Sequence, residues 1–564
     1  MMSLFVNALV NLFRLLRNAY ARVLRRPPDF VWIPVTGALP EFEPPRLGLL
    51  RRRLQPRPPD LSLEGIRGRL DRILADGRVK GVILRVENLD AGWASLEELR
   101  AELRRFKESG KKVVAYLMDP DTRSYYLASA ADEIFAPPLS SLNVVGLRTR
   151  VNFLKDTLES LGLEAEVLAV SPYKSAQDPI SRSGFSKESR EQVERLLDGR
   201  FGELVTAISV GRGITPEETR ALIDNAPYSA SEAAEKKLLD GVRYEDELAG
   251  MLAEGEKPAK LTQWGTASKA LEVPYRSRKA RKVVGLVSIT GAIVRGVSRR
   301  SPVPLPFLGR EQAGSDSVVA ALRVAEKSRR IAAILLHVDS PGGDAFASDL
   351  IWREVERIRS KKPVVVLMGN VAASGGYYVS APACHVIARK NTITGSIGVV
   401  LARPVAAGLL GKLKVNPVAI GRGAHSNLLD PRRPPTADEL AVLNEQLRTV
   451  YGEFKNRVVS GRRIRPDALE EVAGGRVWTG VEALERGLVD EVGGFRAALE
   501  KARELAEIPK EAADTLVRVS PPRAARPTPG EPVGEAVDAV RAASSELRAG
   551  RVWAIAPYEI FDDW

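Results

Sequence analysis

Short apolar runs alternate with amphipathic stretches along most of the chain. In the second half, the runs that predict buried strands are Val283–Ser288, Ile331–Val338, Pro363–Met368 and Val386–Ala388. Segments with apolar residues at helical spacing lie between and after them, at 316–328, 347–360, from Gly375 onward, and at 438–461. Strands that alternate with helices predict an α/β fold with a largely parallel sheet.

The same pattern occurs twice. Val82–Glu87 resembles Ile334–Asp339, and Tyr125-Tyr126 resembles Tyr377-Tyr378 at the same offset, while later matches continue the alignment. Such self-similarity indicates an internal duplication, so two tandem α/β domains are expected.

The repeat divides the chain into five expected segments. These are an N-terminal amphipathic helix (1–28), a first repeat (29–257), a linker (258–282), a second repeat (283–510), and a Pro- and Arg-rich linker with a C-terminal tail (511–564). Within the second repeat, the Arg-rich stretch Arg295–Arg310 is expected to form a rim loop that contacts membrane or substrate.

Composition narrows the class of protein. The chain has 564 residues, of which 44% are hydrophobic and 27% charged, as in soluble globular domains. The formal net charge is +13, but basic residues are spread along the chain without a nucleic-acid-binding signature, so no nucleic-acid partner is expected. The single cysteine, Cys384, excludes a disulfide framework and a cysteine metal cluster, and is expected to be a small core residue. No metal or other cofactor is expected.

The N-terminal segment is amphipathic and basic. Leu9, Leu12, Phe13 and Leu16 fall at helical spacing, with arginines interleaved among them. Its uncharged run, 3–13, is far shorter than the ~20 apolar residues that a spanning helix needs. We favour a helix that lies on a membrane surface, with packing on the protein itself or a neighbouring subunit as the alternative. A signal peptide is disfavoured because its charges should precede the apolar core.

The strongest chemical signal is Val371–Tyr378, which reads VAASGGYY. A serine on a small-residue turn between a strand and a helix exposes a hydroxyl for attack, and the helix start supplies N–H groups for developing negative charge. The alternative is an ordinary glycine-rich turn, since short motifs often match by chance. A second glycine-rich loop, 339–344, follows the preceding strand. Loops at strand ends of such sheets meet in one crevice, which would bring the Gly343 and Gly375 N–H groups together.

The duplication supplies an internal control for this site. The position in the first repeat that aligns with Ser374 is Thr122, and its neighbours are no longer glycines. Only the second repeat therefore keeps the features of a nucleophile with an oxyanion hole.

A nucleophilic serine needs a base. Of the three histidines, His337 and His385 fall in or at the start of strands and His425 lies in a loop, so a Ser-His-Asp triad is disfavoured. The alternative is a lysine, which must be neutral and therefore desolvated. The repeat draws attention to Lys174 in the first half, since Ser426 stands at the aligned position; a solvated surface lysine is the alternative interpretation.

Four motifs in order give a family resemblance. They are Tyr173-Lys174-Ser175, Ser340-Pro341-Gly342-Gly343, Ala372–Tyr378 and Thr394–Val399. With the duplication, they make the chain similar to the long form of bacterial signal peptide peptidase A over roughly residues 30–505. The resemblance implies two Clp-protease/crotonase-like domains and a Ser–Lys dyad, with Ser374 as nucleophile and Lys174 as general base. It also implies an oxyanion hole at Gly343 and Gly375, and a supporting role for Ser396 beside the lysine.

The resemblance further implies a serine endopeptidase that degrades cleaved signal peptides and other short, unstructured peptides. It implies a homotetramer associated with the bacterial cytoplasmic membrane, and leaves the side of the membrane open. Long relatives commonly begin with a clear spanning helix, and this chain departs from them in its Arg-interrupted N-terminus. Two other classes are weighed against this one: a crotonase-type acyl-CoA hydratase or isomerase, which needs carboxylates, and a non-catalytic membrane scaffold.

Overall fold

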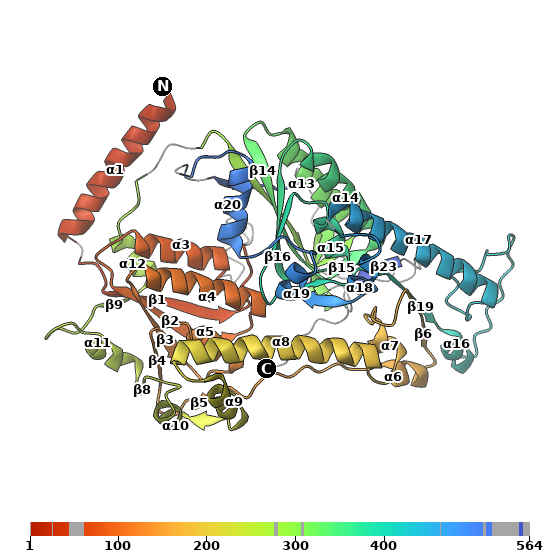
Figure 1. The fold of residues 1–564 in the computed structure, drawn as a ribbon, viewed down its shortest axis with the longest axis horizontal. Helices are drawn as coiled ribbons and strands as arrows, with labels where there is room; N and C mark the ends of the chain where they lie inside the picture. Colours follow the sequence, from red (N-terminus) through yellow and green to blue (C-terminus); the bar gives the residue numbers. More distant parts are fainter. Residues whose placement is uncertain are drawn as a thin grey trace. The chain divides into compact units, whose positions relative to one another are not determined.

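The structure is a computed structural model, and it describes residues 2–24, 26–43, 61–275, 280–305, 309–462, 464–510, 512, 515–521 and 552–555. The chain divides into two compact units (Figure 1). Unit 1 contains Met1–Arg148 and Asp198–Lys279, and unit 2 contains Thr149–Leu197 and Ala280–Asp563.

Unit 1 is built on a six-stranded sheet with the order β8-β4-β3-β2-β1-β9, in which every neighbouring pair is parallel. Its strands are β1 (Phe30–Gly37), β2 (Gly81–Leu89), β3 (Lys112–Leu117), β4 (Glu133–Ala136), β8 (Gly241–Val242) and β9 (Leu261–Gln263). A separate pair is formed by β5 (Ser141–Leu142) and β7 (Tyr228–Ser229).

The helices of unit 1 pack on both faces of this sheet, because its strands are apolar on both faces. Val31, Ile33 and Val35 of β1 lie in the larger core, whereas Phe30 and Trp32 lie in a second, smaller core with residues of 248–259. The larger core includes α3 (Leu63–Leu74), α4 (Trp93–Glu108) and α5 (Thr122–Ala128). Of α8 (Lys187–Arg212), the residues from Asp198 onward belong to unit 1. The remaining helices are α9 (Pro216–Asp224), α10 (Ala230–Glu235), η1 (Glu245–Glu247), α11 (Leu248–Met251) and α12 (Trp264–Ala270).

The N-terminal helix α1 (Met2–Leu24) lies against the segment that follows α12. The Asn18 amide donates to Val273 O over 3.0 Å and accepts from Val273 N over 2.9 Å. Arg22 forms an ion pair with Glu272 at 2.6 Å. The polar side of α1 therefore faces the protein, and its large apolar residues whose side chains are described are mostly exposed: Leu9, Leu12, Phe13, Leu15, Leu16, Tyr20 and Val23.

The main sheet of unit 2 repeats the plan of unit 1. It runs β20-β18-β16-β14-β10-β22, with β17 joined to β16 and β21 joined to β17. Its strands are β10 (Val283–Thr290), β14 (Ile331–Ser340), β16 (Val364–Ala373), β17 (His385–Ala388), β18 (Ile393–Gly395), β20 (Val477–Thr479), β21 (Glu491–Val492) and β22 (Leu516–Arg518). All pairs are parallel except β18–β20. The order β21-β17-β16-β14-β10-β22 therefore matches β8-β4-β3-β2-β1-β9 strand for strand.

Helices cover both faces of this main sheet of unit 2 as well. Figure 1 shows α20 (Phe495–Leu505) on one side of β14 and β16, and α13 (Ser315–Lys327) with α14 (Ala345–Arg359) on the other. The other helices of unit 2 are α6 (Lys155–Ser160), α7 (Asp178–Ser181), α15 (Gly375–Ser380), α16 (Ala407–Lys412), α17 (Ala437–Gly461), α18 (Leu469–Val472) and α19 (Gly480–Glu485).

Unit 2 carries a second sheet, with the order β12-β13-β11-β15-β23-β19-β6. Its strands are β6 (Glu164–Ala169), β11 (Ala292–Val294), β12 (Arg299–Leu305), β13 (Gly309–Gly314), β15 (Gly342–Asp344), β19 (Val400–Val405) and β23 (Val552–Ile555). The Arg-rich stretch expected as a rim loop contributes β12 and part of β13, which pair antiparallel.

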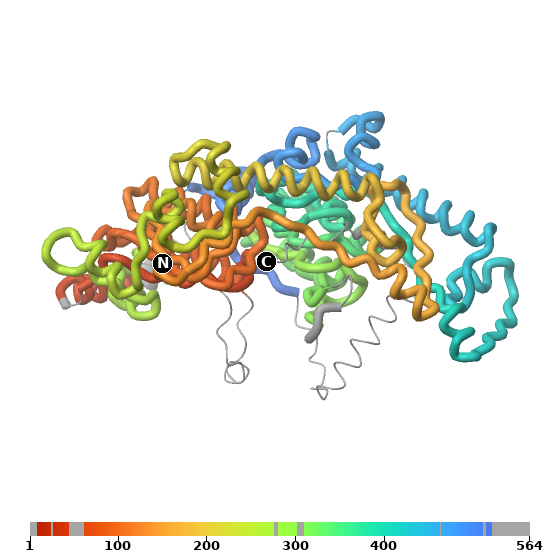
Figure 2. Tube along the Cα trace, turned by 90° about the horizontal axis from the view of Figure 1, so that it is seen from below, coloured from red at the N-terminus to blue at the C-terminus, as the bar shows by residue number. Residues whose placement is uncertain are grey.

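These elements confirm the duplicated α/β architecture predicted from the sequence. Two ranges are organised differently from the segments expected from the sequence. Residues 258–282, expected as a linker, contain β9 and α12 of unit 1. Residues 149–197 belong to the first sequence repeat but pack within unit 2, where β6 pairs antiparallel with β19 from Val400↔Ala169 to Val405↔Glu164. Figure 2 shows this orange segment beside the cyan β19. Most of the 511–564 tail lies outside the described residues.

Candidate active site

Ser374 lies in unit 2 between β16 and α15, at the turn expected from the sequence. Its φ of 54° and ψ of −113° place a non-glycine residue in a sparsely populated backbone region. The Ser374 N–H donates to Gly395 O over 2.8 Å, and the side chain is fully buried. The surrounding structure therefore holds the serine in a strained turn, at the start of a helix.

The two glycine-rich loops meet beside this serine. A Cβ atom built on Gly375 would lie 3.1 Å from the Gly343 nitrogen and 2.6 Å from Ser348 Oγ. Gly375 is the first residue of α15, and the first N–H groups of a helix have no acceptor within it. Two backbone N–H groups thus lie close together next to Ser374, and a substrate oxyanion there would be stabilised.

Lys174 reaches the same point from the segment 149–197. Its Nζ lies 2.7 Å from Ser374 Oγ, and it donates to Ser396 Oγ over 2.9 Å and to Ser396 O over 3.1 Å. Lys174 is 2% exposed, and Ser374 and Ser396 are 0% exposed. All five residues singled out in the sequence are therefore brought together within unit 2.

Burial sets the protonation of this amine. Desolvation lowers the pKa of Lys174 well below its ordinary value of 10.5, because a charged ammonium loses its hydration inside the protein. An amine with a lowered pKa can be neutral at moderate pH, as a general base must be.

The loop that carries Lys174 is attached to β20 and to the residues just before it. The Gln192 side chain donates to Tyr173 O and accepts from Val477 N, each over 3.0 Å. Gly475, at φ 86°, approaches so closely that a Cβ there would lie 2.7 Å from Lys174 Cα. These contacts fix the backbone from which the lysine side chain extends.

Gly475 and Gln192 were not identified from the sequence. The duplication does contain a signal for the glycine, since Gly474-Gly475 of the second repeat aligns with Asp224-Asn225 of the first. A glycine pair that occurs in one repeat alone indicates a local backbone requirement. Gln192 carries no such signal, because its role depends on a strand almost three hundred residues later.

The histidines lie elsewhere, as the sequence indicated. His337 is buried within β14, His385 lies 2.9 Å from Glu491, and His425 is exposed. Among the described residues, the hydrogen-bond partners of Ser374 Oγ are Lys174 Nζ and, at 3.5 Å, Gly398 O, so no histidine there serves it. The expectation for Cys384 was wrong: it is exposed, because it lies in the turn before β17 and not within a strand.

The equivalent position in unit 1 has a different environment. Thr122 Oγ1 donates to the carbonyl of Gly146 over 3.0 Å, and the residue before it, Asp121, caps α5. Across the described ranges, no group of three His, Cys, Asp or Glu side chains could hold a metal ion.

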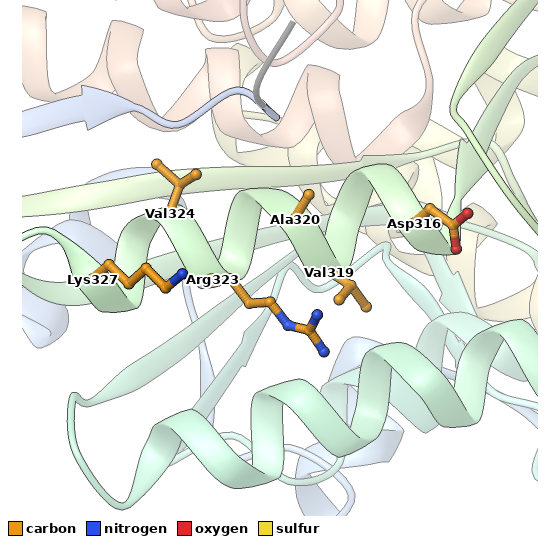
Figure 3. Close-up of a pocket in the computed structure, with 6 residues that line it drawn as sticks. All are labelled: Asp316, Val319, Ala320, Arg323, Val324 and Lys327. Carbon is orange, nitrogen blue, oxygen red and sulfur yellow. The ribbon is translucent and has the colours of Figure 1, made fainter. Parts of the chain in front are cut away.

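A hollow on the surface of unit 2 lies away from these residues. Figure 3 shows its lining, Asp316, Val319, Ala320, Arg323, Val324 and Lys327, all from α13. It contains no member of the Ser374 cluster and comes from a single helix, so the chemistry is not located there.

Comparison with known proteins agrees with this geometry. The model of peptidase family S49 matches residues 105–259 and again 356–509, and that of Clp protease matches 308–391. The chain belongs to peptidase family S49. The two matches confirm the duplication, with Lys174 in the first and Ser374 in the second.

Relatives of this family cover most of the chain. A chloroplastic serine protease SPPA of Arabidopsis thaliana is 35% identical over 487 residues, covering 85% of this chain and 70% of the relative. Protease 4 of Haemophilus influenzae is 30% identical, covering 76% and 71%, and Protease 4 of Salmonella typhi is 29% identical, covering 82% and 76%. The match over both repeats confirms the resemblance to the long form of signal peptide peptidase A, and the chain is a serine peptidase of this family.

We predict that Gly475→Ala displaces Lys174 and lowers kcat for peptide hydrolysis by about 10²-fold, since small misplacements of reacting groups carry such costs. Gly423→Ala is the matched control: its φ of 92° gives similar backbone strain, but a Cβ there meets nothing within 4 Å. Steady-state kinetics and thermal unfolding of both variants test the prediction. Equal kcat in the two variants would contradict it.

Proposed function

We propose that this protein is a serine endopeptidase with a Ser374–Lys174 dyad. The observation that carries the proposal is the 2.7 Å contact between Lys174 Nζ and Ser374 Oγ at a buried site where the pKa of the lysine is lowered. Burying a lysine costs free energy, because its charged form loses hydration. Buried lysines with a lowered pKa are therefore found most often at functional sites.

The proposed mechanism begins with a neutral Lys174. A neutral amine has two N–H groups and one lone pair; the N–H groups can donate to the Ser396 oxygens while the lone pair faces the Ser374 hydroxyl. The amine takes the hydroxyl proton as Oγ attacks a peptide carbonyl carbon. The Gly343 and Gly375 N–H groups stabilise the tetrahedral oxyanion.

Collapse of the tetrahedral intermediate completes the first half of the reaction. Lys174 returns the proton to the leaving amine as the peptide C–N bond breaks, which leaves an ester on Ser374. Water, deprotonated by the same lysine, then hydrolyses the ester and regenerates the hydroxyl. Ser396 keeps the amine aimed at Ser374 during both halves.

We propose short, unstructured peptides, including cleaved signal peptides, as the substrates. The support is the family resemblance and the names of relatives, among them a "Putative signal peptide peptidase SppA" of Enterococcus faecium that is 35% identical over 199 residues. The buried position of Ser374 also favours an extended chain over a folded protein, because a narrow segment reaches a recessed residue more easily than a folded surface does.

The competing classes have less support. An acyl-CoA hydratase or isomerase needs a carboxylate as acid or base, and the side chains that contact Ser374 and Lys174 in the described ranges are lysine and serine. A scaffold without catalysis would not need a buried lysine opposite a strained serine.

We also propose that α1 lies on an anionic membrane surface, at the bacterial cytoplasmic membrane. No helix in the described part of the chain combines the length and apolar character needed to cross a bilayer. The exposed apolar stripe of α1 faces away from Asn18 and its partner segment, with Phe13 72% exposed and Val23 81% exposed. Such a stripe on a basic helix fits an interfacial position. Assembly as a homotetramer is likewise proposed from the resemblance.

Replacing either member of the dyad tests the chemistry directly. We expect Ser374→Ala and Lys174→Ala each to lower kcat for a fluorogenic peptide by about 10⁴-fold or more. The two residues act as one catalytic unit, so losing either one removes most of the rate that the pair provides. Ser374→Ala should also abolish covalent labelling by a fluorophosphonate. His337→Gln and His385→Gln are the controls and should keep activity. Activity in either dyad variant would exclude the mechanism.

The lowered pKa of Lys174 predicts that both activity and stability rise with pH. Activity requires the neutral amine, so kcat/KM should rise with pH through the lowered pKa of Lys174, below 10.5. The unfolded state binds this proton more tightly than the folded state, so the stability of the wild type should rise as pH increases from the lowered pKa toward 10.5. Lys174→Met should therefore unfold at a higher temperature than the wild type at neutral pH, with a difference that shrinks in alkali. A Lys174→Met variant less stable than wild type at every pH would refute the burial argument.

Membrane association can be measured by sedimentation with vesicles of phosphatidylglycerol and phosphatidylcholine. We expect the wild type to bind, with affinity falling as salt screens the basic side chains. Phe13→Glu with Leu16→Glu should abolish binding, because two charges enter the apolar stripe. The matched control is Leu139→Glu, at a leucine of unit 1 that is 96% exposed and not part of α1. Equal binding of both variants would contradict the proposed role of α1.

A further inference from the structure

The C-terminal strand β23 occupies the middle of the second sheet of unit 2. It pairs antiparallel with β15, with Gly342↔Ile555, Gly343↔Ala554 and Asp344↔Trp553. On its other side it pairs antiparallel with β19, through Val400↔Trp553 and Leu401↔Val552. A segment from the far end of the chain thus completes a sheet whose neighbouring strands lie more than a hundred residues earlier.

The sheet order shows that β23 lies between two groups of strands. The strands on one side are β12-β13-β11-β15, and those on the other are β19-β6. No pairing between β15 and β19 exists, so only β23 joins the two groups in the described part of the chain. Strands in a sheet are ~4.8 Å apart, so the edges of β15 and β19 flank a slot about one strand wide. Without β23 both edges would be unpaired, and unpaired strand edges bind extended peptides by strand addition.

This slot lies at the proposed active site. Gly343, which faces Ala554, supplies one oxyanion N–H, and β23 also contacts α15, which begins directly after Ser374. On the other edge, β19 begins four residues after Ser396, and β6 ends five residues before Lys174. Both strands that pair with β23 therefore contain, or lie within a few residues of, a member of the dyad site or its oxyanion hole.

We propose that Val552–Ile555 is a tethered occupant of the substrate slot, which peptides must displace before cleavage. The proposal rests on the proposed function and adds to it a competitor within the same chain. A substrate and β23 would use the same backbone groups of β15 and β19, so they cannot bind together. Tethering through 522–551 converts a weak four-residue contact into an intramolecular one, with an effective concentration in the millimolar range.

Ala554→Pro in the full chain tests this competition. A proline there removes the backbone N–H and weakens strand pairing, while Ala543→Pro, in the same tail but outside β23, is the matched control. We expect Ala554→Pro to lower the KM for a fluorogenic peptide about threefold or more with kcat unchanged, because an occupied site reduces apparent affinity by its free fraction. Thermal unfolding should not change.

Two outcomes would overturn the proposal. An unchanged KM in Ala554→Pro means that β23 does not compete, and a lower kcat together with earlier unfolding means that β23 is a permanent part of the sheet. A synthetic peptide of residues 549–557 should inhibit Ala554→Pro competitively and inhibit the wild type less. Equal inhibition of both would also contradict the proposal.

The same question can be asked without catalysis. In the Ser374→Ala background, fluorescence anisotropy measures the binding of a labelled peptide substrate with and without Ala554→Pro. Tighter binding with the proline supports the competitor even if the dyad mechanism fails. Conversely, absence of hydrolysis and of fluorophosphonate labelling in the wild type would refute the dyad and leave this binding result standing.

Discussion

The site depends on keeping one lysine amine out of water. Lys174 can act on Ser374 only while it is neutral, and burial is what lowers its pKa. The fold meets this requirement by packing residues 149–197 into unit 2, where β6 pairs with β19 and Gln192 connects the Lys174 loop to β20. The close approach of Gly475 to Lys174 completes the enclosure. Loss of any of these contacts would admit water to the amine and raise its pKa.

Duplication explains how the two halves came to share one site. The sheets of the two units have the same strand order, and α5 and α15 begin at equivalent turns. The second copy keeps Ser374 between two glycine-rich loops, whereas Thr122 in the first copy bonds to Gly146 O. Lys174 comes from the first copy, and Ser426 stands at its place in the second. Each copy has therefore lost the residue type that the other provides.

The second sheet of unit 2 links catalysis to recognition of an extended chain. β15 carries Gly343, and β19 follows Ser396, so the groups that would bind a peptide backbone lie next to those that would cleave it. Backbone pairing recognises any extended peptide regardless of its sequence, which suits a peptidase that acts on short unstructured segments. The C-terminal strand β23 pairs with the same two strands.

The sequence alone determined the α/β class, the duplication and the turn at Ser374, because apolar periodicity and glycine positions are local properties that a linear pattern records. It also indicated Lys174, through comparison of the repeats and the family resemblance. Only the tertiary structure decided that residues 149–197 pack in unit 2, that Gly475 and Gln192 hold the lysine loop, and that Val552–Ile555 lies between β15 and β19. Those features join residues hundreds of positions apart, and such pairings depend on how edges and surfaces meet in space, which no local pattern encodes.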